Sequence, residues 1–196
     1  MKDIIFASLK ESIDTKTYLL EHEIPAIEIC GIKLAEHIKN KGKVLLCGNG
    51  GSAADAQHLA AELVVRFRSK VNRPAIGAIA LTVDPSIMTA GGNDIGFDNV
   101  FAREVEAYGN PNDIIIGIST SGNSENVLRA LKKAKSMGIT TIGLLGGNGG
   151  TIKDFCDYTV IVPATTTARI QECHITIGHI WCEIIEEILF KEFIIG

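Results

Sequence analysis

The chain has 196 residues, of which 46% are hydrophobic and 21% are charged, and its formal net charge is −4. This length and balance are ordinary for one well-packed globular domain. Because the net charge is negative and no basic run exceeds Lys132–Lys133, the composition argues against a nucleic-acid-binding protein.

The first residues and the cysteines indicate a cytoplasmic protein. Lys10, Glu11 and Asp14 interrupt the N-terminal apolar run before the core of a signal peptide can form, and no apolar stretch approaches the length of a membrane span. The five cysteines include no C-x-x-C pair and form no recognisable disulfide framework. We therefore expect a cytoplasmic location and no membrane partner.

Apolar periodicity predicts an α/β fold. Two helices are expected at the start of the chain, over roughly 3–19 and 23–40, where apolar residues recur at three- and four-residue spacing. From residue 43 onward, short apolar runs alternate with helical stretches, as in parallel strands joined by crossover helices. This pattern predicts a doubly wound, five-stranded parallel sheet flanked by helices. The expected strands cover 44–47, 75–82, 114–119, 140–146 and 158–163.

The stretch 48-GNGGSAADAQHLAAE-62 begins as an anion-binding turn. Gly48, Gly50 and Gly51 follow an expected strand, and Ser52 is placed to cap the helix that comes next. Backbone N–H groups at such a helix start favour an anion. The stretch also fits G-x-G-x-x-A, but the acidic residue that a dinucleotide-binding fold needs about 20 positions later is missing. We therefore favour a sugar phosphate over a dinucleotide.

The stretch 118-ISTSGNSENV-127 places several hydroxyls beside the start of another helix. Ser119, Thr120 and Ser121 precede a glycine, and Ser124 stands where the helix is expected to begin. A capped turn requires fewer hydroxyls than this, so we favour phosphate binding. Because the carboxyl ends of parallel strands gather at one edge of the sheet, both loops are expected to open into one crevice.

Between these stretches, 91-GGNDIGFDN-99 is expected to be a glycine-rich turn. Its Asn93 and Asp94 either only form the turn or hold sugar hydroxyls beside the crevice. The stretch 146-GGNGG-150 is interpreted as a plain turn.

His58 and Glu62 follow the first loop at a four-residue spacing, which puts both side chains on one face of a helix. A last, largely apolar helix is expected over roughly 166–193, covered either by another subunit or by the core of its own chain. On it, Gln171 and His179 point within about 80° of each other, so both can face the crevice. Two imidazoles, a carboxylate and an amide oxygen suit a divalent metal of the zinc type, and the same Glu and His can instead act as base and acid.

Four motifs together resemble the phosphoheptose isomerase family, a branch of the sugar isomerase (SIS) domain superfamily. They are CGNGGSAADAQHLAAEL, GGNDIGF, GISTSGNSENV and ARIQECHITIGHIWCE, in order between about residues 42 and 190. The resemblance implies one SIS domain over 1–196, with residues 1–41 used in oligomer packing, and a homotetramer with active sites at subunit interfaces and one Zn²⁺ per subunit. It implies conversion of sedoheptulose 7-phosphate to D-glycero-D-manno-heptose 7-phosphate, for bacterial lipopolysaccharide or capsule.

The resemblance also implies roles for individual residues. Glu62 is expected to move the carbon-bound proton and His179 the oxygen-bound proton. Ala168 stands where some members of the family carry Asp, so a sugar contact from that Asp is missing here. The phosphate is expected at Ser52, Ser119, Thr120, Ser121 and Ser124 with the backbone of Gly50 and Gly51, the sugar at Asn49, Asn93, Asp94 and Gln171, and the metal at His58, Glu62, Gln171 and His179.

Other functions also occur on SIS domains. The alternatives are a non-catalytic sugar-phosphate sensor, a protein that associates with the bacterial replication initiator, and a purely structural oligomer. A binding module needs no base and acid facing each other, so Glu62 and His179 favour the enzyme.

Overall fold

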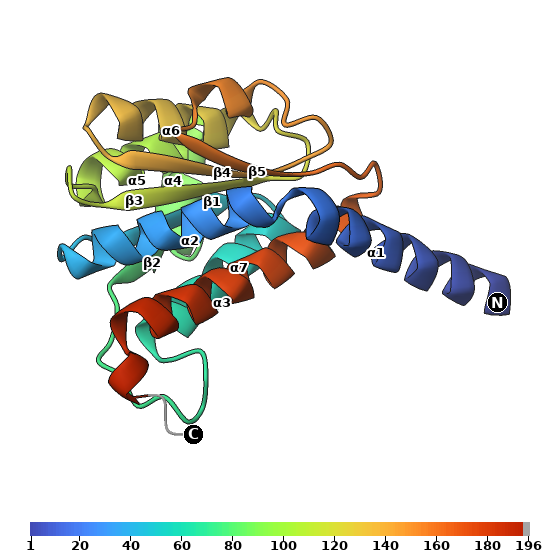
Figure 1. Ribbon diagram of the computed structural model, residues 1–196. Helices are drawn as coiled ribbons and strands as arrows, with labels where there is room; N and C mark the ends of the chain where they lie inside the picture. Colours follow the sequence, from blue (N-terminus) through green and yellow to red (C-terminus); the bar gives the residue numbers. More distant parts are fainter. Residues whose placement is uncertain (194–196) are drawn as a thin grey trace.

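The computed structural model describes residues 1–193 and is built around one parallel β-sheet (Figure 1). Its strands are β1 (Val44–Gly48), β2 (Ala78–Ala80), β3 (Ile114–Ser119), β4 (Thr140–Gly146) and β5 (Tyr158–Val162). They lie in the order β2-β1-β3-β4-β5, with parallel pairing throughout, which confirms the predicted doubly wound sheet. The strands β1, β3 and β4 are almost fully buried, because helices cover both of their faces.

The strand order creates a switch point between β1 and β3. From β1 the chain adds β2 on one side, and then adds β3, β4 and β5 on the other side. Gly48 at the end of β1 pairs with Ile118 near the end of β3, so the two strands end side by side. Ligands of open parallel sheets bind beyond the carboxyl ends of the strands at such a point. Both predicted ligand loops leave the sheet there.

Helices form one layer on each face of the sheet (Figure 1). One layer contains α2 (Ile24–Lys39), α3 (Gly51–Val64) and α7 (Thr167–Leu189), and the other contains α4 (Pro85–Asp94), α5 (Val100–Tyr108) and α6 (Glu125–Ser136). Each layer packs on its own apolar core. Trp181 joins α7 to α2 by donating from Nε1 to the Ile27 carbonyl at 3.0 Å. Within residues 1–193, no helix combines the length and hydropathy that a membrane crossing requires.

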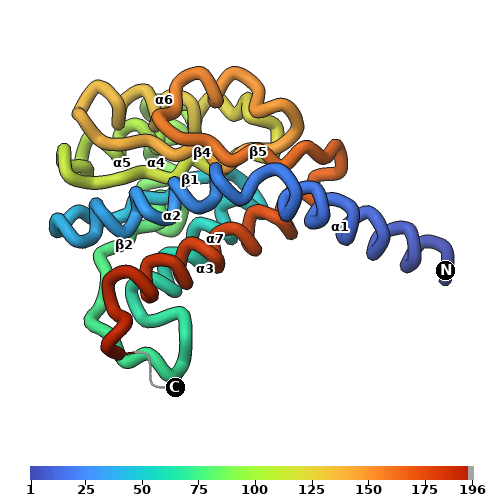
Figure 2. The backbone as a smooth tube through the Cα atoms, viewed as in Figure 1, coloured from blue at the N-terminus to red at the C-terminus, as the bar shows by residue number. Residues whose placement is uncertain are grey.

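The first helix, α1 (Lys2–His22), extends away from the rest of the molecule (Figure 2). Its apolar side chains are mostly exposed: Ile4 is 65% exposed, Phe6 71% and Leu9 61%. On α7, by contrast, Ile177 and Trp181 are buried inside the chain. The terminal helix is therefore largely covered by its own core, and the exposed apolar surface lies mainly on α1.

Two sequence predictions of secondary structure are wrong in part. The strand expected over 75–82 is confined to 78–80, where it pairs with β1 at the edge of the sheet. The supposed turn at 91–94 is the last turn of α4. That helix is started by Pro85 in its first turn and by Asp84, whose carboxylate accepts from two backbone N–H groups, and this start outweighs the two glycines.

Candidate active site

Two helices bring an imidazole, a carboxylate and a second imidazole together. His58 and Glu62 lie one turn apart on α3, with His58 Nε2 3.3 Å from Glu62 Oε1. His179 reaches them from α7, and its Nε2 lies 2.9 Å from His58 Nε2. The three ligand atoms all lie within 4.8 Å of one another. The structure therefore brings together three of the four residues that were predicted to hold a metal, and we call them the His–Glu–His cluster.

Close approach of α3 and α7 makes the cluster possible. A Cβ atom at Gly178 would lie 2.5 Å from Leu59 Cδ2, so a larger residue here would have to displace Leu59. One end of this contact is marked by Gly51, where a Cβ atom would lie 2.2 Å from Gln171 Nε2. Gln171 thus lies against the first turn of α3, at the loop that begins the helix.

The first loop differs from its prediction in one detail. Gly50, not Ser52, occupies the N-cap position of α3, with φ of 56°. This positive φ suits glycine, so Ser52 falls inside the first turn and its side chain is buried. Asn49 exchanges two amide hydrogen bonds with Asn126 of α6, at 2.9 and 2.8 Å, and this pair ties the first loop to the second.

The second loop gathers its hydroxyls as predicted. Ser124 is the N-cap residue of α6 but makes no capping bond, and its Oγ lies 2.9 Å from Ser119 Oγ. Ser121 Oγ is 3.5 Å from the same atom. The Ser121 hydroxyl also accepts from the backbone N–H of Asn123 at 3.1 Å. Hydroxyls keep an O–H that can turn outward to an anion. Thr120, between them, is partly exposed.

The glycine-rich turn after β4 supports this second loop. The sequence predicted only a plain turn at this position. Gly122, in the second loop, lies so close to the turn that a Cβ atom on it would be 2.2 Å from the Gly149 carbonyl oxygen. Asn123 Oδ1 also accepts from the backbone N–H of Thr151 at 2.9 Å. The turn 146–150 therefore fixes the shape of the loop that bears the hydroxyls.

Asn93 and Asp94 lie exposed at the end of α4. Within residues 1–193, their side chains hydrogen-bond only to each other, from Asn93 Nδ2 to Asp94 Oδ1 at 2.7 Å. In the described chain they therefore make no hydrogen bond to the His–Glu–His cluster.

Two further titratable groups lie near these elements. Asp55, one turn before His58, is half-buried, and burial raises its pKa to about 6, with a smaller opposing effect from His58. His174 faces the sheet from α7, and burial lowers its pKa to about 4, with the Leu145 backbone acting in the opposite direction. The sequence analysis did not single out Asp55, although it lies on the same side of α3 as His58 and Glu62.

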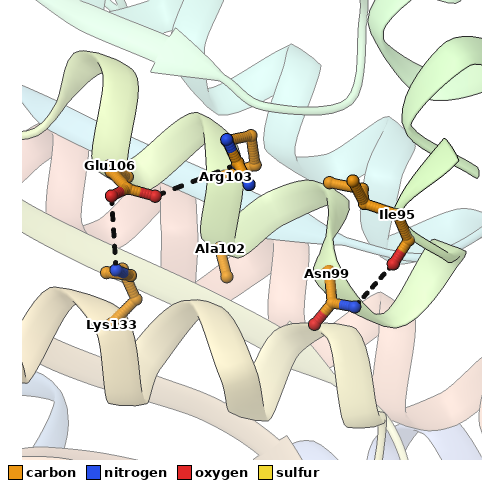
Figure 3. Close-up of a pocket in the computed structure, with 6 residues that line it drawn as sticks. All are labelled: Ile95, Asn99, Ala102, Arg103, Glu106 and Lys133. Carbon is orange, nitrogen blue, oxygen red and sulfur yellow. Dashed lines mark hydrogen bonds and ion pairs between the residues drawn. The ribbon is translucent and has the colours of Figure 1, made fainter.

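A separate hollow between α5 and α6 is a poor candidate for the site (Figure 3). Its charges already pair: Glu106 lies 3.9 Å from Arg103 Nε and 3.7 Å from Lys133 Nζ. Asn99 donates to the Ile95 carbonyl at 2.6 Å. These side chains satisfy one another across the other face of the sheet.

Comparison with known proteins assigns the chain to a family. The SIS domain profile matches residues 9–146. The chain is 53% identical to phosphoheptose isomerase of Clostridium acetobutylicum, over 98% of each protein. This chain belongs to the phosphoheptose isomerase family. It is also 52% identical to the Chlorobaculum parvum member, over 96% of this chain and 90% of that protein. The solved phosphoheptose isomerase of Neisseria gonorrhoeae superposes with a TM-score of 0.89 at 41% identity, over 95% of this chain and 98% of that one.

Proposed function

We propose that this protein converts sedoheptulose 7-phosphate to D-glycero-D-manno-heptose 7-phosphate. One observation carries the proposal: in a member of the phosphoheptose isomerase family, Glu62 and His179 converge from two helices, and the helix that bears Glu62 begins at one of two ligand loops. Aldose–ketose isomerisation needs such a base and acid, because a proton moves between C1 and C2 through an enediol.

Each catalytic group has a defined task in this proposal. Glu62 takes a proton from C1 of the ketose and returns it to C2. His179 carries the proton that O1 loses to O2, so that the aldehyde forms at C1 and a hydroxyl at C2. The enediol between these steps carries developing negative charge on its oxygens, which favours donors placed beforehand at those atoms.

The phosphate end is bound by the two loops at the switch point. Hydroxyls and backbone N–H groups at helix starts are the groups that proteins use for phosphate. Anchoring C7 there leaves C1 and C2 free to reach the cluster on α3 and α7. The phosphate ligands in this proposal are Ser52, Ser119, Thr120, Ser121 and Ser124 with the backbone of Gly50 and Gly51, and the sugar ligands are Asn49, Asn93, Asp94 and Gln171.

The His–Glu–His cluster fits Zn²⁺. Two imidazole nitrogens and a carboxylate oxygen converge from His58, Glu62 and His179, which is a donor set that zinc prefers. Gln171 is the fourth proposed ligand. When bound, the ion supplies polarisation of the substrate carbonyl oxygen.

We also propose that the protein is a homotetramer with active sites at subunit interfaces. The exposed apolar residues of α1 and a groove between α1, α2 and α7 support this, because a second copy of the chain would bury both. Asn93 and Asp94, which make no hydrogen bond to the cluster in the described chain, would then meet a site of another subunit. Light scattering tests this proposal: Leu9→Glu is expected to lower the mass of the assembly, and an unchanged mass would contradict it.

The first experiment is turnover of sedoheptulose 7-phosphate, followed by NMR before and after chelation and return of Zn²⁺. Conversion that returns with zinc supports both the isomerase and the metal. A conversion rate that chelation does not change supports the isomerase without a role for an exchangeable metal. No conversion, with sugar-phosphate binding retained in calorimetry, favours the non-catalytic sensor or the replication-initiator partner.

The biological setting is also a proposal. Family membership is consistent with heptose synthesis in the cytoplasm, for lipopolysaccharide or for capsule. Deleting the gene and analysing the heptose of each polymer would separate these two pathways.

A further inference from the structure

A buried ion pair lies about two helical turns beyond the His–Glu–His cluster along α7. Arg73, in the loop between α3 and β2, places Nε 3.1 Å from Glu186 Oε1 of α7. Both side chains are only 1% exposed. Glu186 is two helical turns beyond His179, so the pair lies at the end of the α3–α7 contact.

The arginine of this pair holds the end of α3. Its Nη2 donates to the backbone carbonyl of Glu62 at 2.8 Å, and its Nη1 donates to the carbonyl of Leu63 at 2.9 Å. The last carbonyls of a helix have no partner inside the helix, so this guanidinium caps α3 at the proposed base. The position of Glu62 therefore depends on Arg73.

Glu186 is connected to the proposed acid, His179, through Phe67. Glu186 Oε1 also accepts from the backbone N–H of Phe67 at 3.1 Å. The Phe67 ring packs on the His179 imidazole, with 5.2 Å between centroids and 34° between planes. Arg68 adds a bond from Nε to Glu186 Oε2 at 2.8 Å. The position of the His179 ring therefore depends on Glu186 through Phe67.

We propose that Glu186 is a positioning residue that sets the separation between Glu62 and His179, through Arg73 on one side and Phe67 on the other. The inference rests on the proposed function, from which it takes the roles of these two groups. A buried ion pair by itself contributes little net stability compared with apolar packing. Here its hydrogen bonds end on the backbone that carries the base and on the residue that packs against the acid.

The test compares Glu186→Gln with a matched control, Asp113→Asn. Asp113 is also a buried carboxylate that pairs with a cation and accepts from backbone N–H groups, but its partners are Lys43 and Asn110 and not residues of α3 or α7. We expect Glu186→Gln to lower kcat by about 10- to 100-fold with KM changed less than about threefold, because small misplacements of reacting groups are costly. Asp113→Asn is expected to lower Tm but leave kcat unchanged. Equal kcat values in the two variants would overturn the proposal.

A second variant keeps the proposal testable if Glu186→Gln does not fold. Phe67→Leu retains the backbone N–H that bonds to Glu186 but removes the ring that packs on His179. It is expected to lower kcat, and if both variants fold, the double variant should lose little more than the larger single loss, because the two residues act on the same imidazole. Wild-type kcat in Phe67→Leu, or full additivity in the double variant, would count against the proposal.

A readout that needs no turnover separates this inference from the proposed function. The His179 imidazole lies close to the Phe67 ring, so the NMR chemical shifts of the imidazole depend on the position of that ring. These chemical shifts are expected to change in Glu186→Gln and to remain unchanged in Asp113→Asn. If the wild-type protein lacks isomerase activity, the proposed function fails, while these shifts still decide whether Glu186 positions His179.

Discussion

Polar residues at the amino edge of the sheet form different bonds from those of the candidate active site. At the amino edge, Asp113 accepts from the backbone N–H of Lys43 at 2.9 Å and of Asn110 at 2.8 Å. Asp157 likewise accepts from the backbone N–H and the hydroxyl of Thr141, at 2.9 and 2.8 Å. The oxygens of both carboxylates accept hydrogen bonds from backbone N–H groups. These bonds hold the chain in place where the strands begin.

In the second loop at the carboxyl edge, and in the His–Glu–His cluster between α3 and α7, several polar side chains bond to one another. Ser119 meets Ser124, and His58 meets His179 and Glu62. A ligand can replace such side-chain bonds without breaking the backbone framework. Polar residues at the amino edge thus stabilise the fold, whereas those of the second loop and the cluster make side-chain bonds that a ligand can replace.

The largest expected effect is in the His–Glu–His cluster, in Glu62→Gln. The amide keeps the size of the side chain but cannot accept the proton from carbon, so kcat is expected to fall by about 10² to 10⁴-fold. Calorimetry should still detect sugar-phosphate binding, because the hydroxyl loops are unchanged. Near-normal turnover would remove Glu62 from its proposed role.

The next effect is at the amino edge, in Asp113→Asn. Weakening a buried, charged acceptor is expected to lower the free energy of unfolding by about 2 kcal/mol. Chemical denaturation measures this loss, and kcat/KM at a temperature where the variant stays folded should match the wild type. A large loss of turnover would show that the amino edge is not functionally separate from the candidate active site.

A smaller effect is expected from Ser124→Ala at the carboxyl edge. Loss of one hydrogen bond to a phosphate is expected to raise KM about tenfold with little change in kcat. The change should disappear with a substrate that lacks the phosphate. The helix should tolerate it, because the Ser124 side chain makes no capping bond. An unchanged KM would place the phosphate elsewhere.

The smallest effect concerns a buried carboxyl on α5. Burial raises the pKa of Glu104 from 4.5 to about 7, and the charge of Asp84 adds to this shift. The unfolded chain ionises near the ordinary value, so stability falls as pH rises between these two values. Glu104→Gln is therefore expected to raise the free energy of unfolding by about 1 kcal/mol above pH 7. The gain should vanish below pH 4.5, and a gain independent of pH would contradict this account.

An acid with the opposite behaviour lies at the amino edge. Burial alone would raise the pKa of Asp157, but hydrogen bonds from Lys135 and Thr141 outweigh it and lower the pKa below its usual value. The stability from this carboxylate is present at neutral pH and is lost as pH falls through its lowered pKa. Asp157 and Glu104 therefore contribute opposite dependences of stability on pH.

Local patterns in the sequence determined much of this protein. Continuous apolar runs predicted the buried strands β1, β3 and β4, because such runs suit strands covered on both faces. The spacing of His58 and Glu62 placed both on one face of α3, since a helix repeats every 3.6 residues. The sequence also predicted that the hydroxyls of the second loop gather at a helix start, because they follow a strand and precede a helix.

Only the tertiary structure decided how distant parts meet. His58 and His179 are 121 residues apart, and their contact depends on α3 packing against α7 at Gly178. The same packing joins Glu186 to Arg73 and Phe67, which no spacing rule connects. Periodicity tells which face of an element is apolar, but the contacts between elements arise from side-chain shape and the order of the strands.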